Sequence, residues 1–363
     1  AAMPDLSAAQ LIIGFLLLLT PVVFFHELGH YWVARRAGVV VEVFSVGFGP
    51  EIYGWTSRST GTRWRIAAIP LGGYVRMRGD ETEAGGEAEG ASSLSGSFAA
   101  AGLWWRIAIV AAGPIANFIL GILLFAMVYM TAGKIFLPAQ IGEVMPETAA
   151  AEAGLRPGDM VTEIDGISVR DFNDMRGLVV ESPGRALDFT ILRDGRELTL
   201  DVTPTPRFNE ELQIYIGVLG VKSVGAGARE RLLPGSALVA ATSDAFRMSV
   251  MILRGLARLG SGQMQAGEVQ GPVGIAKISG SALQQGLIPF VLLTAVISIN
   301  LGLINLLPIP ALDGGHLVFF FWEAIFGKPL PLAVQGVLLR GGIAILMGLM
   351  VVLVAFDLAR LVG

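Results

Sequence analysis

The sequence contains no cysteine and only 3 histidines, and 15% of its 363 residues are charged, against about 25% in an ordinary soluble domain. The absence of cysteine excludes disulfides, thiolate metal sites and cysteine nucleophiles. A formal net charge of −4 argues against a partner nucleic acid, because proteins that bind nucleic acid are usually basic. Any imidazole chemistry must therefore use His26, His30 or His316.

Hydrophobic residues, by contrast, make up 53% of the chain, and the mean hydropathy is +0.65. So much apolar surface predicts contact with the lipid bilayer. Uncharged stretches of about 20 residues or more predict a polytopic α-helical membrane protein with four transmembrane helices. The spans predicted around these stretches are residues 6–34, 104–133, 283–326 and 329–360, and each includes at least one charged residue. The first lacks the basic n-region and the A-x-A-like cleavage site of a signal peptide, so we expect it to remain as a span.

The distribution of arginine predicts the orientation of these spans. The residues ahead of the first span carry no arginine or lysine, whereas the stretch that follows it is rich in arginine. Its arginines are Arg35, Arg36, Arg58, Arg63, Arg65, Arg76, Arg78 and Arg106. The positive-inside rule places the loop 35–103 in the cytoplasm and the N-terminus outside. Within this loop, residues 39–77 alternate in a way typical of strands, and residues 80–97 form a Gly/Ser-rich linker.

The long segment between the second and third spans is expected outside the cytoplasm. Residues 134–206 carry short strand-like runs around a helical AAAEAGL, and AEAGLRPGDMVTEIDGISV resembles a PDZ domain of the bacterial type. The fold expected there is α+β, and it is either a β-rich spacer or a groove that binds a peptide as an added strand. Residues 207–282 complete the segment, with an amphipathic helix expected at 236–258 near the membrane.

The first span contains His26-Glu27-Leu28-Gly29-His30, which is the pattern H-E-x-x-H. On a helix this spacing puts both imidazoles on one face, where they can share one Zn²⁺ with Glu27 as general base. These residues could instead be polar groups at a helix end facing the membrane surface. That alternative is disfavoured because ionisable side chains in a span cost about 2.5–3.5 kcal/mol each.

A zinc hydrolase usually has three protein ligands and one position left for water. Asp313 is an isolated carboxylate near the cytoplasmic end of the third span, at the depth expected for the H-E-x-x-H pattern. It is therefore the candidate third ligand, although a carboxylate before Gly-Gly could also cap a helix. His316 lies three residues after Asp313 and on a helix could also be a ligand. We expect it instead to support or pack near the site, because a fourth protein ligand would leave no place for water.

Six features in order resemble the site-2 protease family of intramembrane metalloproteases, specifically bacterial RseP-type regulators of sigma-factor signalling. They are H-E-x-x-H, the arginine-rich β-like loop with GFGP, GPIAN in the second span, the PDZ-like region, GPVGIA, and NLLPIPALDGGH. One difference is that some RseP-type proteins carry two PDZ domains, whereas this chain shows one.

The resemblance implies a bacterial inner-membrane zinc metalloprotease that cleaves transmembrane segments of single-pass proteins, such as anti-sigma factors or remnant signal peptides. It also implies His26, His30 and Asp313 as zinc ligands and Glu27 as catalytic acid/base. Asn305 would help to hold unwound substrate, and the loop 39–77 would contact the substrate backbone. Asn117 either contacts substrate or bonds across helices.

The sequence also allows two other classes of protein. A metal-ion transporter would use the same ligands for transit, but it predicts more intramembrane acidic ligands and an internal repeat, neither of which is found. A PDZ scaffold anchored by its helices would leave the buried His-Glu-His cluster without a role.

Overall fold

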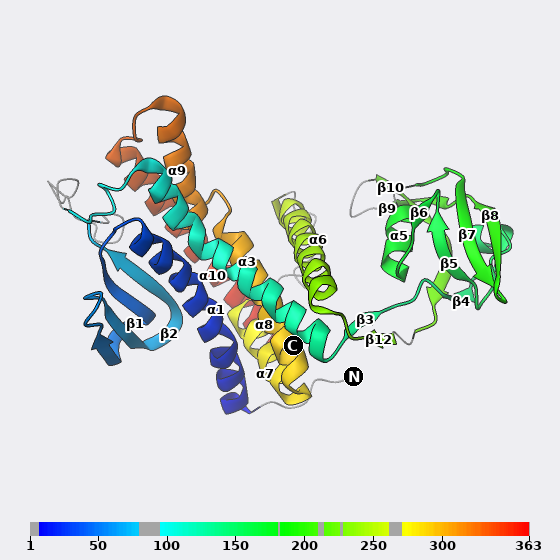
Figure 1. Ribbon diagram of the computed structural model, residues 1–363, viewed down its shortest axis with the longest axis horizontal. Coiled ribbons are helices and arrows are strands. Elements are labelled where there is room, and N and C mark those ends of the chain that lie inside the picture. The colour runs from blue at the N-terminus through cyan, green and yellow to red at the C-terminus, as the bar shows by residue number, and fades with distance from the viewer. Residues whose placement is uncertain are drawn as a thin grey trace. The chain divides into compact units, whose positions relative to one another are not determined.

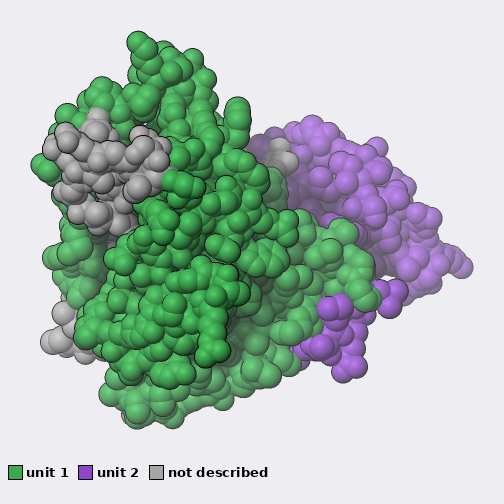
Figure 2. Space-filling model, turned by 60° about the vertical axis from the view of Figure 1, so that its left-hand side comes forward, with its two compact units in different colours: residues 1–128, 234–363 green, residues 129–233 purple. Residues whose placement is uncertain are grey.

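The computed structural model describes residues 7–79, 95–180, 182–209, 214–225, 228–260 and 271–362. The chain divides into two compact units (Figure 2). Residues 129–233 form the smaller unit, which is inserted in the sequence of the larger one, residues 1–128 and 234–363.

The larger unit is built of helices and one long hairpin (Figure 1). Its helices are α1 (Ala8–Arg36), α3 (Leu103–Thr131), α6 (Pro234–Gly260), α7 (Pro272–Gln285), α8 (Leu287–Asn305), α9 (Asp313–Phe326) and α10 (Leu332–Val362). In the described part of the chain, five helices are long and apolar enough to cross a membrane: α1, α3, α6, α8 and α10. The helix that was not among the four predicted spans is α6, which we expected as an amphipathic helix at 236–258. The count of four spans therefore stays a prediction.

The predicted third span, residues 283–326, is not one helix. Gly286, with φ of 117°, separates α7 from α8, and residues 306–312 separate α8 from α9. The second break has a local cause, because Pro308 and Pro310 lack backbone N–H groups and disfavour helical geometry in the residue before them. Ala311 completes the break with φ of 86°. The chain thus starts a new helix at Asp313.

The hairpin consists of β1 (Val41–Thr56) and β2 (Arg63–Met77), which lie beside α1 (Figure 1). Both strands bend, so that residues 43–46 pair with 73–76 on one side and with 63–66 on the other. The segment 73–76 is therefore an edge of this small curled sheet among the described residues. Both strands lie within the stretch 39–77 in which we expected strands. Of the predicted linker 80–97, residues 80–94 lie outside the described residues.

Aromatic and aliphatic side chains fix the hairpin against α1 and α3. Phe44, which is 1% exposed, stacks on Trp64 with ring centroids 4.3 Å apart. Tyr31 of α1 and Ile109 of α3 belong to the same buried cluster. Burial of these large side chains, at roughly 1.5–3 kcal/mol each, holds β2 beside the part of α1 that carries the histidines.

The smaller unit is an α+β fold around a four-stranded sheet in the order β6-β5-β7-β8. Its elements are β3 (Lys134–Phe136), β4 (Ile141–Val144), α4 (Ala149–Glu152), β5 (Met160–Ile164), β6 (Ile167–Ser168), α5 (Phe172–Val180), β7 (Leu187–Arg193), β8 (Arg196–Val202), β9 (Thr205–Asn209), β10 (Ile214–Val218), β11 (Val221–Ser223) and β12 (Ala228–Glu230). The two-residue turn Asp194-Gly195 joins β7 to β8 with positive φ at both positions, as tight hairpins require.

One ion pair ties the sheet of this unit to a neighbouring loop. Asp159 is 1% exposed, and Arg193 of β7 donates two hydrogen bonds of 2.7 Å to its carboxylate. Burial alone would raise the pKa of Asp159. The bonds from Arg193 and from the Arg156 backbone N–H outweigh it and hold that pKa below its usual value.

Candidate active site

The histidine pair lies on the buried face of α1. His26 and His30 are both 8% exposed and Glu27 is 9% exposed, although the helix around them is apolar. The i, i+4 spacing places the two imidazoles one turn apart, edge-to-face, with ring centroids separated by 4.8 Å. Both rings therefore face the same neighbouring elements.

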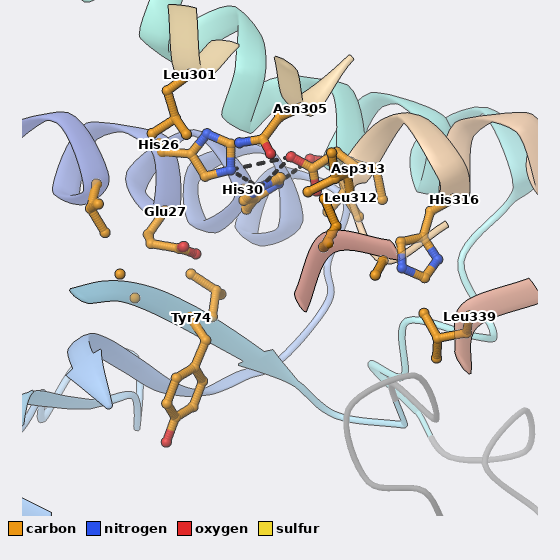
Figure 3. A pocket seen from close by; sticks show the side chains of 18 of the residues that line it. His26, Glu27, His30, Tyr74, Leu301, Asn305, Leu312, Asp313, His316 and Leu339 are labelled. Atoms are coloured by element: carbon orange, nitrogen blue, oxygen red, sulfur yellow. Dashed lines mark hydrogen bonds and ion pairs between the residues drawn. The ribbon is translucent and has the colours of Figure 1, made fainter. Parts of the chain in front are cut away.

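Asp313, the first residue of α9, brings a carboxylate to the two imidazoles. Its Oδ2 lies 3.2 Å from His26 Nε2 and 3.6 Å from His30 Nε2, and the two Nε2 atoms are 3.2 Å apart. Figure 3 shows the three side chains pointing toward one another. A tetrahedral zinc with bonds of 2.0–2.1 Å would separate its ligand atoms by about 3.3 Å. The three atoms thus have the spacing of zinc ligands.

The hydrogen bonding of this cluster also fits a cation. Asp313 Oδ2 is buried and, among the described residues, has no hydrogen-bond partner, although both Nε2 atoms are near. His30 Nδ1 lies 2.8 Å from the carbonyl oxygen of Ile109, and a carbonyl can only accept. The Nδ1 of His30 therefore carries a proton, and its Nε2 is left to face the cluster as a ligand atom.

The break before α9 determines where Asp313 points. Leu312 takes the N-cap position and Asp313 follows as the first helical residue. The alternative that Asp313 serves as the helix cap is therefore wrong. Its side chain is directed to the imidazoles instead (Figure 3).

A cavity of about 960 Å³ opens beside the three ligand atoms. Glu27, Asn305 and His316 line it together with His26, His30 and Asp313. Strand β2 contributes Gly72, Gly73 and Tyr74, and α10 contributes Leu339, Ile343 and Met347. These residues of α10 were not expected at the site, because the apolar sequence on either side of Arg340 does not distinguish a cavity wall from a lipid-facing surface.

Glu27 lies between the imidazoles and the hairpin. A Cβ placed on Gly73 would be 3.0 Å from Cγ of Glu27, so the glycine leaves room for this side chain against β2. Figure 3 shows Glu27 on the cavity side of α1, next to His26 and above the strand that carries Tyr74. The general base expected from the sequence is thus next to both the ligand cluster and the strand edge.

The other residues singled out from the sequence lie around the cluster. His316 lines the cavity, and its ring contacts Phe319 edge-on with ring centroids 6.0 Å apart. It is not part of the cluster of possible metal ligands, which among the described residues consists of His26, His30 and Asp313. Asn305 lines the cavity at the end of α8. Asn117 is fully buried, with its Nδ2 3.2 Å from His26 Nδ1. A contact between Asn117 and substrate stays a prediction.

Gly113 of α3 gives the clearest structural test of the cluster. A Cβ at this position would lie 2.2 Å from His30 Nε2 and 2.9 Å from His26 Cε1. Gly113→Ala is therefore expected to displace an imidazole, and we expect zinc affinity to fall at least tenfold, because loss of ligand orientation alone costs about 10–100-fold. Gly348→Ala in α10 is the control, since nothing lies within 4 Å of its added Cβ. Equal zinc affinity of the two variants would contradict this placement of His30.

Comparison with known proteins agrees with a metalloprotease. The profile of peptidase family M50 matches residues 14–349. An Agrobacterium fabrum protein named as a zinc metalloprotease is 40% identical over 97% of this chain and 96% of its own length. Metalloprotease MmpA of Caulobacter vibrioides is 37% identical, with 96% of each chain covered.

Among solved structures, the PDZ domain of an SdrC-like protein from Listeria innocua is 16% identical. The match covers 24% of this chain and 92% of that one, with a TM-score of 0.21.

Proposed function

The chain belongs to peptidase family M50 and is a membrane metalloprotease, and we propose that it cleaves peptide bonds within the transmembrane segments of single-pass proteins. The observation that carries this proposal is the cluster of His26, His30 and Asp313 beside Glu27. Both histidines lie on α1, which is long and apolar enough to cross a membrane, and Asp313 begins the shorter helix α9. A hydrolytic site buried among such helices is suited to a substrate that arrives from the lipid.

His26, His30 and Asp313 would hold one zinc ion, each with one ligand atom. Two imidazoles and one carboxylate are the donor types that zinc takes in hydrolases, and three protein ligands leave a position open. The ion would supply Lewis acidity to the water and to the scissile carbonyl. Proton transfer and substrate binding would be carried out by side chains of the cavity.

Glu27 is the proposed proton carrier. Its carboxylate would accept a proton from the attacking water and pass it to the nitrogen of the leaving amine. Its position against Gly73 keeps this carboxylate on the cavity side of α1, near the strand that lines the cavity. Asn305, also in the cavity wall, would donate a hydrogen bond to the substrate backbone.

The edge segment 73–76 is the proposed site at which the unwound substrate binds as an added strand. A transmembrane helix hides its peptide bonds in internal hydrogen bonds, so it must unwind before it can be cut. Among the described residues, 73–76 pair with 43–46 on one side only, and Gly73, Tyr74 and Val75 line the cavity. An unwound substrate that adds to this edge gains main-chain hydrogen bonds next to Glu27.

The proposed setting is a bacterial inner membrane. The arginine-rich loop would face the cytoplasm, and the N-terminus and the smaller unit would face the periplasm, with four of the apolar helices as spans. We interpret the smaller unit as a PDZ domain that binds a peptide or restricts bulky substrates. Anti-sigma-factor-like proteins and remnant signal peptides are the proposed substrates.

Metal removal tests the proposed reaction. Purified full-length protein treated with a strong chelator is expected to lose cleavage of a single-pass model substrate, and stoichiometric zinc should restore it. Chelator-treated protein that has been reloaded with zinc before the assay is the control for damage to the fold. Undiminished cleavage after complete zinc removal would contradict a zinc-dependent mechanism.

A further inference from the structure

Asn117 meets the side of His26 that faces away from the ligand cluster. This residue of α3 is fully buried, and its Nδ2 lies 3.2 Å from His26 Nδ1. Its Oδ1 is buried too and has no hydrogen-bond partner in the described part of the chain. A buried amide oxygen without a partner costs about 1–3 kcal/mol, so this arrangement needs an explanation.

The position of the proton on His26 supplies one. His26 Nε2 faces Asp313 Oδ2 and His30 Nε2, so it is the nitrogen that would bind the metal. A neutral imidazole that uses Nε2 as a ligand carries its proton on Nδ1, which is then a donor in need of an acceptor. An amide NH₂ opposite that N–H would set two donors against each other.

Rotation of the Asn117 amide by 180° places Oδ1 opposite His26 Nδ1 and moves Nδ2 to the position that Oδ1 now occupies. The amide oxygen and nitrogen have nearly the same size, so the rotation exchanges them without a change of shape. Oδ1 then accepts from His26 Nδ1–H at the position now 3.2 Å away, and it is no longer without a partner. His30 shows the same pattern, because its Nδ1 lies 2.8 Å from the Ile109 carbonyl, which is also on α3.

We propose that Asn117 is a positioning residue whose side-chain oxygen accepts the Nδ1–H of His26, holding this imidazole in the tautomer that presents Nε2 to the metal. The proposal rests on the proposed function, since it gives Asn117 a role at the same zinc site.

The main chain of Asn117 has a separate contact that provides a matched control. Ser298 of α8 is fully buried, and its Oγ donates to the backbone carbonyl of Asn117 at 2.8 Å. Ser298→Ala removes this buried bond but leaves the side-chain amide at His26. If this region had only a structural role, variants of Ser298 and of Asn117 would change zinc affinity to a similar extent. The proposal predicts that only loss of the Asn117 acceptor weakens zinc binding.

The test measures zinc affinity of purified full-length protein by competition with a chelator of known affinity. Asn117→Leu, which keeps the shape but has no acceptor, is expected to weaken zinc binding about 10–100-fold. Asn117→Asp keeps an acceptor and is expected to stay within about threefold of wild type, as is Ser298→Ala. The thermal unfolding of each apo variant is measured in parallel, and Asn117→Ala replaces the leucine variant if that one does not fold.

Equal zinc affinity of Asn117→Leu and wild type would overturn the proposal, and so would equal weakening by the leucine and aspartate variants. A wild-type protein that binds no zinc would overturn the proposed function, and this inference with it.

Discussion

Glu27→Gln is expected to slow cleavage of a single-pass substrate by about 10²–10⁴-fold, the range that a positioned general acid/base contributes. Glutamine has nearly the shape of glutamate, but its amide cannot take a proton from water. Because Glu27 is not one of the three clustered ligand residues, the variant should bind as much zinc as wild type. The measurement is the initial rate of product formation at matched zinc content.

Glu152→Gln is the control for this experiment, because Glu152 is exposed on α4 of the smaller unit. It should cleave at the wild-type rate. Equal rates for Glu27→Gln and wild type would remove Glu27 from the mechanism, while a loss of zinc in Glu27→Gln would show that this carboxylate holds the metal instead.

Replacement of any of the three proposed ligands should release the metal. Wild-type protein is expected to hold about one zinc per chain, and His26→Ala, His30→Ala and Asp313→Ala each remove one of the three proposed ligands. We expect the purified variants to retain almost no zinc by elemental analysis, and cleavage to fall below detection.

His316→Ala is the matched comparison, since His316 lines the same cavity three residues beyond Asp313. It should keep its zinc. If His316→Ala lost zinc while Asp313→Ala retained it, the assignment of the third ligand would have to change.

The residues of the candidate site could be predicted from sequence because of their setting. His26, Glu27 and His30 interrupt an apolar helix, where ionisable groups are costly unless they have a partner or a function. The orientation deduced from arginine placed Asp313 at a similar depth, and the structure brings its Oδ2 within 3.6 Å of both imidazoles. The types of these residues and their expected depth in the membrane together were enough to predict which residues form the cluster.

The contacts around the cluster depend on long-range packing, which the sequence pattern does not contain. Alternation in residues 39–77 predicts strands, but it does not predict the register shifts that leave 73–76, among the described residues, as an edge beside Glu27. The contact of Asn117 with His26 likewise requires the close approach of α3 to α1 that Gly113 permits.

The division of the predicted span 283–326 shows a different limit. Hydropathy treats Ser279–Leu312 as one uncharged stretch, but Gly286, Pro308 and Pro310 end helices inside it. Backbone preferences of single residues thus decide where Asp313 stands, while the average over a window does not register them.

The position of the cut in the substrate tests the central claim most directly. A single-pass protein with one apolar span is incubated with wild-type enzyme, and the masses of both products identify the broken peptide bond. The account predicts new termini within the apolar span and none in the soluble flanks. Products cut only in the flanks, with the span intact, would contradict a membrane-embedded site that acts on unwound transmembrane segments.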